Sequence, residues 1–196
     1  MDDTIRYYDE NALDFFQNTK DANMKDLYAI FLSYLPEKAK ILDLGCGSGR
    51  DTKYFLDKGY DVVALDGSIE MVKLSSEYTG RKTLYMKFED IDFHEEFDGI
   101  WACASLLHVS RSNIDNIFKK IYNALKKDGI LFASFKYGNK EEYRNGRFFN
   151  YYDQESFTLL INNHPYFEIV KTVITTDVRQ GRENEKWFSA VLRVIK

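Results

Sequence analysis

Three glycines at alternate positions end a short apolar run in the segment Asp43-Leu44-Gly45-Cys46-Gly47-Ser48-Gly49. Glycine permits a positive φ and lets a bound molecule approach the backbone closely. The N–H groups of such a loop, and of a helix that follows it, can receive polar ligand atoms. An ordinary strand-to-helix turn needs one glycine, so the repeat favours a binding loop. It differs from the dinucleotide pattern G-x-G-x-x-G, because Arg50 stands where the third glycine belongs.

A carboxylate follows this loop at a spacing that suits sugar recognition. Asp66 ends the next apolar run, 21 residues after Gly45. In nucleotide-binding folds, an acid about 20 residues beyond the glycine loop accepts hydrogen bonds from ribose hydroxyls. Taken alone, Asp66 could equally be a turn or helix-capping residue. The loop and the acid together predict a nucleoside-like ligand that needs no pyrophosphate.

Strands that alternate with helices would bring these residues to one edge of a sheet. The alternation of apolar runs with helical spacings predicts an α/β, Rossmann-like, mostly parallel seven-stranded sheet with helices on both faces. Only seven residues separate the last two strands, too few for a parallel crossover, so we expect a C-terminal antiparallel hairpin. The expected strands are 41–44, 60–66, 83–87, 97–103, 130–135, 167–178 and 186–195.

The remaining segments predict helices and one loop. Helices are expected at 50–58, 68–78, 112–127 and 153–161, with two more within 9–35. Ser68 and Asp153 are candidate N-caps, Ser112 with Asp115 resembles a capping box, and Gly129 is expected to end its helix. The polar stretch 138–147 reads as an exposed loop. We predict a single domain over 1–196, with a helical lid at 1–36 and a Rossmann-like core at 37–196.

Four segments resemble motifs of the class I S-adenosylmethionine-dependent methyltransferases. They are ILDLGCGSGR, VVALDGS, FDGIWACASLLH and ALKKDGILFASF, and the similarity covers nearly the whole chain. Within this family, the overall pattern most resembles small single-domain bacterial enzymes of the tellurite-resistance type. The resemblance implies S-adenosylmethionine as the cofactor and S-adenosylhomocysteine as the product.

The resemblance also implies the cofactor contacts. It places Asp43, Gly45, Cys46, Gly47 and Gly49 around the methionine part, Asp66 at the ribose, and Gly67, Ser68 and Met71 near the adenine. Asp90 would accept from the adenine amino group, and the Ile91 N–H would meet a ring nitrogen. Glu89 and Asp92 compete with Asp90 for this role, and Asp90 could be a solvated turn residue. Ser105, after the fourth strand, would lie close to the sulfonium.

His108 is the candidate catalytic residue. A base is needed only if the methyl acceptor must lose a proton, since positioning is the main catalytic contribution to such a transfer. His108 follows the fourth strand, whereas His94 lies in an acidic stretch and His164 precedes a proline. The alternative is that His108 only packs beneath the next helix. Cys103 is expected inside the fourth strand and not as a nucleophile.

Basic and aromatic residues gather after the fifth strand and near the N-terminus. Ligands of open α/β sheets bind at the carboxyl ends of the strands, where the segment after strand five begins. The candidates for acceptor binding are His108, Lys136, Arg144, Arg147 and Tyr151, with Tyr8 from the N-terminal helices as part of a lid. Such a set suits a planar or anionic acceptor. The alternative is a solvated loop whose aromatic residues belong to the core.

Composition excludes several classes of protein. The chain has 31 acidic and 27 basic residues, and a net charge of −4 argues against a nucleic-acid partner. Two cysteines and a charged N-terminus fit a cytoplasmic location. No apolar run approaches 18 residues, so no membrane span is expected. No cluster of Cys and His has zinc spacing, so we expect no metal site. The chain is expected to be a monomer or a homodimer.

The leading hypothesis is methyl transfer from S-adenosylmethionine to a small-molecule acceptor, since little chain remains for a macromolecule-docking domain. The cationic residues after strand five also allow an RNA or protein side-chain methyltransferase. The lack of an unmistakable base allows a non-catalytic partner protein that binds S-adenosylmethionine.

Overall fold

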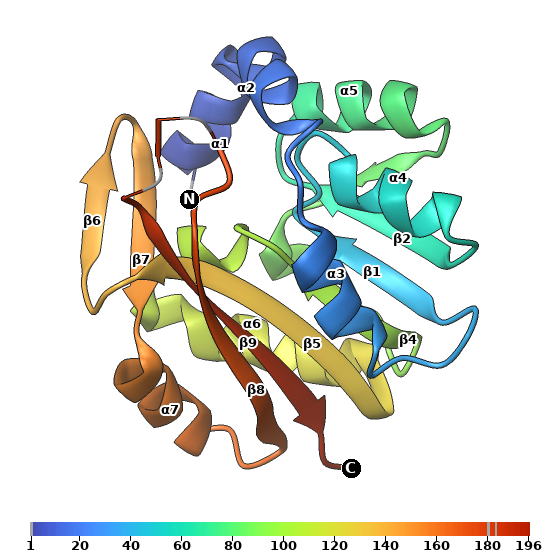
Figure 1. The fold of residues 1–196 in the computed structure, drawn as a ribbon, viewed down its shortest axis with the longest axis vertical. Helices are drawn as coiled ribbons and strands as arrows, with labels where there is room; N and C mark the ends of the chain where they lie inside the picture. The colour runs from blue at the N-terminus through green and yellow to red at the C-terminus, as the bar shows by residue number, and fades with distance from the viewer. Residues whose placement is uncertain (1, 180, 183) are drawn as a thin grey trace.

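The centre of the molecule is one sheet, shown as a ribbon in Figure 1. The computed structural model describes residues 2–179, 181–182 and 184–196. The strands are β1 (Lys40–Leu44), β2 (Asp61–Asp66), β3 (Thr83–Tyr85), β4 (Phe97–Ala102), β5 (Leu125–Tyr137), β6 (Glu141–Arg144), β7 (Arg147–Tyr152), β8 (Phe167–Thr176) and β9 (Lys186–Val194). The helices are α1 (Asp2–Glu10), α2 (Ala12–Thr19), α3 (Lys25–Leu32), α4 (Arg50–Asp57), α5 (Ile69–Thr79), α6 (Arg111–Ala124) and α7 (Gln154–Asn162), with short 3₁₀ helices η1 (Phe88–Asp90) and η2 (Leu106–His108).

The strand order creates a crevice for a ligand. The sheet runs β3-β2-β1-β4-β5-β7-β6, and the pairs from β3 through β5 are parallel. The chain moves outward from β1 to β3 and then returns to the other side of β1 as β4. Helices therefore leave adjacent strands in opposite directions at β1 and β4, which is the point where open α/β sheets bind ligands.

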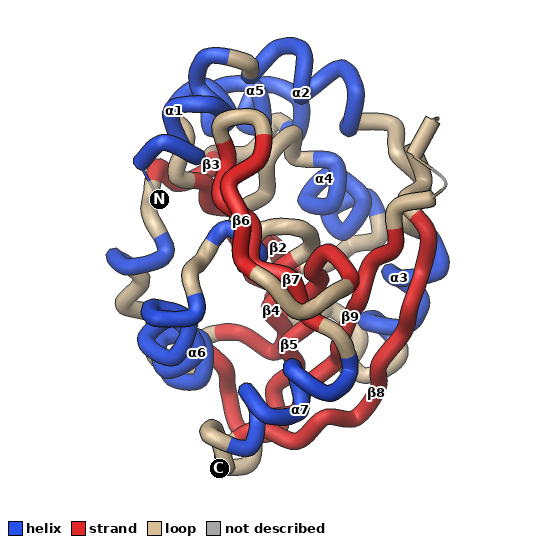
Figure 2. The backbone as a smooth tube through the Cα atoms, turned by 90° about the vertical axis from the view of Figure 1, so that its left-hand side faces the viewer, coloured by secondary structure: helices blue, strands red, loops and turns tan. Residues whose placement is uncertain are grey.

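Alternating side chains of the strands form two cores. On one face, Trp101 of β4 stacks on Phe132 of β5, with ring centroids 4.0 Å apart, beneath Phe31 of α3. On the other face, Ile100 and Leu131 pack with residues of α6 and α7. Figure 2 shows α6 and α3 on opposite sides of the strands. The period of two along each strand produces this separation.

The C-terminal strands pair as predicted. β9 runs antiparallel to β8 and also to β5, so the hairpin extends the sheet past its last long parallel strand. The predicted caps at Ser68 and Asp153 are also confirmed: Ser68 Oγ accepts from the Met71 N–H, and Asp153 forms a capping box with Ser156. None of the helices that the structure describes is both long and apolar enough to cross a membrane.

The sheet has nine strands where seven were expected, because the stretch 138–147 is not an exposed loop throughout. It forms β6 and the start of β7, which pair antiparallel about Asn145 and Gly146. Both turn residues have positive φ, 50° and 76°. An Asn-Gly pair is the strongest short hairpin signal, since both residues tolerate this backbone. The polarity of the segment concealed that signal.

Two further expectations about local structure are wrong. Ser112 and Asp115 form no capping box, because α6 starts at Arg111 after Ser110. Gly129 does not end that helix, because Leu125 already pairs with Phe97 of β4 and a bulge follows in the register. The two helices expected within residues 9–35 are confirmed as α2 and α3, and α1 precedes them as a further helix. Of these, α3 packs into the core, and the helical lid at 1–36 remains a prediction.

Candidate functional site

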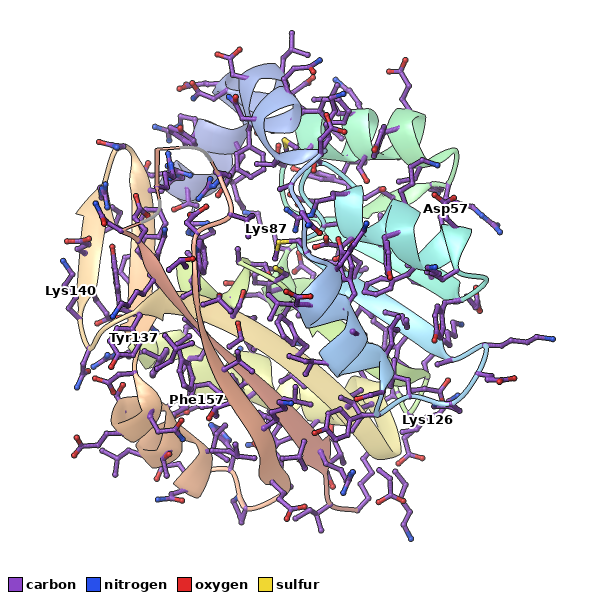
Figure 3. All side chains as sticks on the ribbon, viewed as in Figure 1. Asp57, Lys87, Lys126, Tyr137, Lys140 and Phe157 are labelled. Atoms are coloured by element: carbon purple, nitrogen blue, oxygen red, sulfur yellow. The ribbon has the colours of Figure 1, made fainter. Side chains whose placement is uncertain are left out.

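A cavity of about 790 Å³ lies at the carboxyl ends of the central strands. This volume is within the range of about 300–1,000 Å³ that small-molecule sites occupy. Most of the residues singled out in the sequence line it: Tyr8, Gly45, Cys46, Gly47, Asp66, Gly67, Ser68, Met71, Ser105, His108, Lys136, Arg144, Arg147 and Tyr151. In Figure 3, Lys87, which also lines the cavity, lies near the middle of the molecule, whereas Lys140 lies at its outer edge beside β6.

The glycine loop follows β1 and turns tightly over the end of β2. Its Gly45 and Cys46 N–H groups both donate to the Leu65 carbonyl, at 3.0 Å. Gly45 has φ of 76°, and a Cβ at this position would lie 2.6 Å from the Cβ of Ser105. Only glycine therefore allows β1 and the segment after β4 to approach so closely. The approach brings Ser105 beside the loop.

Asp66 is oriented by the loop. Its Oδ2 accepts from the Gly47 N–H and its Oδ1 from the Ser68 N–H, both at 2.9 Å. Burial raises the pKa of Asp66, and these two backbone donors act in the opposite direction. Each carboxylate oxygen can accept a second hydrogen bond. The side chain is thus fixed at the cavity wall with acceptor capacity for two neighbouring hydroxyl groups.

Two hydroxyl groups that line this part of the cavity differ in their hydrogen bonding. The Ser68 hydroxyl has a partner on α1, whereas the Ser105 hydroxyl has none. Ser68 Oγ donates to Asp9 at 2.6 Å, which attaches α1 to the start of α5. Ser105 is 5% exposed, and its hydroxyl oxygen has no hydrogen-bond partner. Such buried, unpaired groups are rare and often mark a ligand position. The prediction that Ser105 faces a ligand is consistent with this orphan oxygen.

Four predicted cofactor residues, Asp43, Gly49, Asp90 and Ile91, are not among those that line the cavity. The Asp43 carboxylate is buried behind the loop and accepts from Thr52 at 2.5 Å. Burial and the charge of Asp51 raise the pKa of Asp43. Gly49 packs against Ser75 of α5, and Asp90 is exposed on η1. Their roles toward a ligand remain predictions.

A buried carboxylate, Asp51, supports the floor of the cavity and was not singled out in the sequence. It accepts from the Trp101 indole at 2.8 Å, from the Tyr28 hydroxyl, and from Arg50 through two nitrogens at 2.6 and 2.8 Å. Burial would raise the pKa of Asp51, but Arg50 and these donors lower it overall. Asp51 therefore joins α3, α4 and β4 under the site.

His108 and Tyr8 form a hydrogen-bonded pair across the cavity. The Nδ1 of His108 lies 2.7 Å from the Phe148 carbonyl, which can only accept, so Nδ1 carries the proton. Its Nε2 is then an acceptor, and the Tyr8 hydroxyl donates to it at 2.9 Å. Burial lowers the pKa of His108 to about 4, so the ring is neutral at pH 7. The structure thus brings these two predicted residues together.

Arg147 lies beside this pair at the start of β7. Its guanidinium lies 4.3 Å from the centroid of the Tyr7 ring and 5.2 Å from that of Phe149. One nitrogen is 3.5 Å from the Tyr8 hydroxyl, and Nε is buried without a partner. No carboxylate of the described residues forms an ion pair with it.

The other predicted acceptor residues are engaged with the protein. Lys136 pairs with Glu185 and Asp177 and lies 4.2 Å from the Trp187 ring centroid. The Tyr151 hydroxyl donates to Glu142 at 2.6 Å. The side chain of Arg144 is 54% exposed and lies 3.9 Å from Glu185. Sequence position grouped these residues with Arg147, but their charges or hydroxyls already have partners.

The C-terminal hairpin contributes a wall of the cavity that sequence reasoning missed. Residues from this hairpin that line the cavity include Thr175, Asp177, Arg179, Glu185, Trp187 and Ser189. The alternating pattern predicted both strands but did not say that β9 pairs with β5. That pairing sets Trp187 opposite Lys136 and Ser189 opposite Ser134. Among the described residues, no three His, Cys, Asp or Glu side chains are grouped so as to hold a metal ion.

Comparison with known proteins agrees with this geometry. Residues 42–133 match the family model described as a methyltransferase domain. The putative methyltransferase YqeM of Bacillus subtilis is 33% identical over 113 residues, which are 52% of this chain and 46% of that protein. An uncharacterized methyltransferase of Staphylococcus carnosus is 26% identical over 166 residues, or 80% of each chain. The chain thus spans about half the length of the first relative and four fifths of the second.

Solved structures show the same fold. A 1,6-didemethyltoxoflavin-N1-methyltransferase of Burkholderia thailandensis, with 1,6-didemethyltoxoflavin and S-adenosylhomocysteine bound, superposes with a TM-score of 0.84. It is 20% identical, and the alignment covers 100% of this chain and 88% of that one. The subgroup of tellurite-resistance-type enzymes remains a prediction. The matched domain over residues 42–133 and the shared fold make this chain similar to S-adenosylmethionine-dependent methyltransferases.

Proposed function

We propose that this protein methylates a small-molecule acceptor held beside its cofactor. The observation that supports this most is a single cavity lined both by the glycine loop with Asp66 and by Tyr8, His108 and Arg147. A cofactor and a small acceptor can therefore share one cavity. Binding both reactants side by side fixes their relative position, which is the main catalytic contribution expected for this transfer.

The cofactor half fits the group that the family requires. Asp66 has free acceptor capacity for two ribose hydroxyls, and Ser105 offers an unpaired buried hydroxyl. The loop from Gly45 to Gly47 leaves backbone without side chains at the wall. When bound, S-adenosylmethionine supplies an activated sulfonium methyl group. We assign the contacts of this cofactor to Asp66, Ser68, Ser105 and the loop backbone.

The acceptor half can hold and move a proton. The Tyr8 hydroxyl directs its own proton to His108 Nε2, so its oxygen can accept a hydrogen bond from an acceptor O–H or N–H. If the acceptor loses that proton, it passes to the Tyr8 oxygen while the tyrosine proton passes to Nε2. The Phe148 carbonyl keeps the imidazole ring oriented throughout. We assign the base function to this pair and not to either residue alone.

The fold neighbour supports a compact acceptor. The Burkholderia thailandensis enzyme is described with a small heterocycle bound together with S-adenosylhomocysteine. The cavity described above has aromatic walls at Tyr8, Phe15 and Phe149, which suit a planar molecule of similar kind. This likeness supports the size and shape of the acceptor and not its identity.

Calorimetry with S-adenosylmethionine and S-adenosylhomocysteine tests the cofactor half. Asp66→Ala should weaken binding by about 1–3 kcal/mol, because two hydroxyls lose their acceptor. Asp57→Ala is the matched control, since the Asp57 side chain is 64% exposed on α4 and remote from the cavity. Absence of binding to the unaltered protein at millimolar cofactor contradicts the proposal.

A screen of small acceptors, scored by formation of S-adenosylhomocysteine, tests the acceptor half. Turnover of a small molecule supports the proposal over the two alternatives. Methylation confined to RNA or to a protein side chain would replace it with a macromolecular acceptor. Cofactor binding without turnover of any acceptor would indicate a non-catalytic partner protein.

A further inference from the structure

Arg147 is a half-buried cation whose charge no carboxylate of the described residues neutralises. The cations that share the hairpin side of the cavity wall differ from it: Lys136 pairs with Glu185, and Arg179 with Asp177 at 2.5 Å. Arg147 has no such carboxylate among the described residues. Its Nε is buried and unpaired. Removing a charge from water without a counter-ion is costly, so this arrangement points to an anion that binds there.

The surroundings of Arg147 provide contacts but no negative charge. The Tyr7 and Phe149 rings hold the guanidinium by cation–π contact at 4.3 and 5.2 Å. Such contacts orient a guanidinium and leave its positive charge in place. Among the described residues, the polar contact of the guanidinium is to the Tyr8 hydroxyl, at a long 3.5 Å. The planar set of N–H donors is therefore available for a group with two acceptor oxygens.

The position of Arg147 separates it from the cofactor half. The glycine loop follows β1 and Asp66 ends β2, whereas Arg147 begins β7 on the other side of β4 and β5. In the strand order, β4 and β5 lie between β1 and β7. Arg147 instead adjoins Tyr8, which donates to His108.

We propose that the methyl acceptor carries an anionic group, a carboxylate or a phosphate, that binds the guanidinium of Arg147 next to Tyr8. This inference rests on the proposed function and narrows its substrate class. It places the nucleophilic atom of the acceptor near the Tyr8 oxygen and the anion a short distance away on the same molecule. A bound anion would also cancel the positive field of Arg147, which contributes to the low pKa of His108. The acceptor itself would then make Nε2 a stronger base.

Anion binding to the protein saturated with S-adenosylhomocysteine tests this inference. The probes are benzoate, its neutral counterpart benzamide, and inorganic phosphate, each followed by calorimetry. We expect benzoate or phosphate to bind the unaltered protein and benzamide to bind at least tenfold more weakly. Arg147→Gln should weaken binding of the anion about 10- to 100-fold, because a charge-assisted pair is lost. Arg147→Lys should recover part of it.

Arg81→Gln is the matched control, since it removes an equal charge from an exposed turn after α5. It should leave both anion and S-adenosylhomocysteine affinities unchanged. Thermal unfolding of each variant shows whether the fold is kept. If Arg147→Gln does not fold, anion binding is compared between Arg147→Lys and the unaltered protein.

The outcomes separate this inference from the proposed function. Equal binding of benzoate and benzamide, or no binding of benzoate and phosphate, overturns the inference. The inference is also overturned if Arg147→Gln weakens binding of S-adenosylhomocysteine and not binding of the anion, because the guanidinium then binds the carboxylate of the cofactor. Failure of the unaltered protein to bind S-adenosylhomocysteine contradicts the proposed function, and anion titration of the free protein still decides whether Arg147 is an anion site.

Discussion

The two halves of the cavity are assembled in different ways. In the cofactor half, the contacts that orient Asp66 join residues 19 and 2 positions apart. In the acceptor half, Tyr8 bonds His108 across 100 positions, and Arg147 approaches Tyr8 across 139. The first half depends on local backbone geometry, and the second depends on how α1 docks against η2 and β7. A sequence motif can therefore specify the first half but not the second.

The chemistry of the halves also differs. The cofactor half presents the Asp66 carboxylate and the unpaired Ser105 hydroxyl, which suit neutral hydroxyls and polar nitrogen atoms. The acceptor half presents a neutral imidazole, a phenol and an unneutralised guanidinium. This contrast predicts that substitutions in one half change binding of one ligand and leave the other ligand nearly unaffected. The predictions below test that separation.

The largest effect is expected at the floor that supports both halves. Asp51→Ala would leave the Trp101 indole, the Tyr28 hydroxyl and Arg50 without their shared acceptor. Removing one partner of a buried ion pair costs about 3–5 kcal/mol of the free energy of unfolding. Urea denaturation measures this loss, and Asp57→Ala should change the same quantity by less than about 0.5 kcal/mol. A loss as small as that of the control would show that the floor is not structurally required.

One contribution to the pH dependence of stability comes from His108 in the acceptor half. The pKa of His108 is about 4 in the folded protein, lowered first by burial, against an ordinary 6.5. Between these values the unfolded chain binds more protons than the native one, so stability falls as pH decreases from 6.5 to 4. The contribution is up to about 3 kcal/mol at 1.36 kcal/mol per pKa unit.

Comparison of the unaltered protein with His108→Gln isolates this contribution, because other groups such as Asp43 titrate in both. The free energy of unfolding, followed from pH 7 to 4, should decrease less steeply in the variant. Parallel curves for the two proteins would mean that His108 is already accessible to protons.

Tyr8→Phe tests whether the acceptor half works as a pair. The variant keeps the ring that packs 5.0 Å from Phe15 but removes the donor to Nε2. Turnover should fall about 100-fold if the acceptor must lose a proton, while the affinity for S-adenosylhomocysteine stays within about threefold, since no cofactor contact is lost. The pKa of His108, measured by NMR titration, should rise, because the neutral ring loses its hydrogen bond. Weaker binding of S-adenosylhomocysteine together with an unchanged pKa of His108 would instead place Tyr8 in the cofactor half.

The fold and the cofactor half were largely predictable because their signals are local. The strand that ends in Gly45-Cys46-Gly47, and the acid at the end of the next strand, appear in the sequence at fixed spacing. The class of fold follows from the alternation of strands and helices. The Asn145-Gly146 turn was equally local, but its polar surroundings led to the prediction of a loop.

The rest could not be predicted because it depends on long-range packing. Asp51 has no sequence signal that places it under Trp101, and nothing in the pattern states that β9 lies beside β5. The cationic residues after strand five show the same limit. The sequence grouped Lys136, Arg144 and Arg147, whereas the described part of the structure gives a counter-ion to Lys136 and none to Arg147. Whether a cationic side chain can bind a ligand depends on its ion-pair partners, and the sequence does not show those partners.

The smallest effect is expected at Arg144, which the sequence would rank with Arg147. Its side chain is 54% exposed, and its contact to Glu185 is 3.9 Å long. Exposed ion pairs contribute about 0–1 kcal/mol, so Arg144→Gln should lower the free energy of unfolding by less than about 0.5 kcal/mol. Turnover and benzoate affinity should each change less than about threefold, because solvent screens the charge. If Arg144→Gln instead matched Arg147→Gln in anion affinity, the acceptor half would act through a diffuse positive field, and the distinction between the two arginines would be lost.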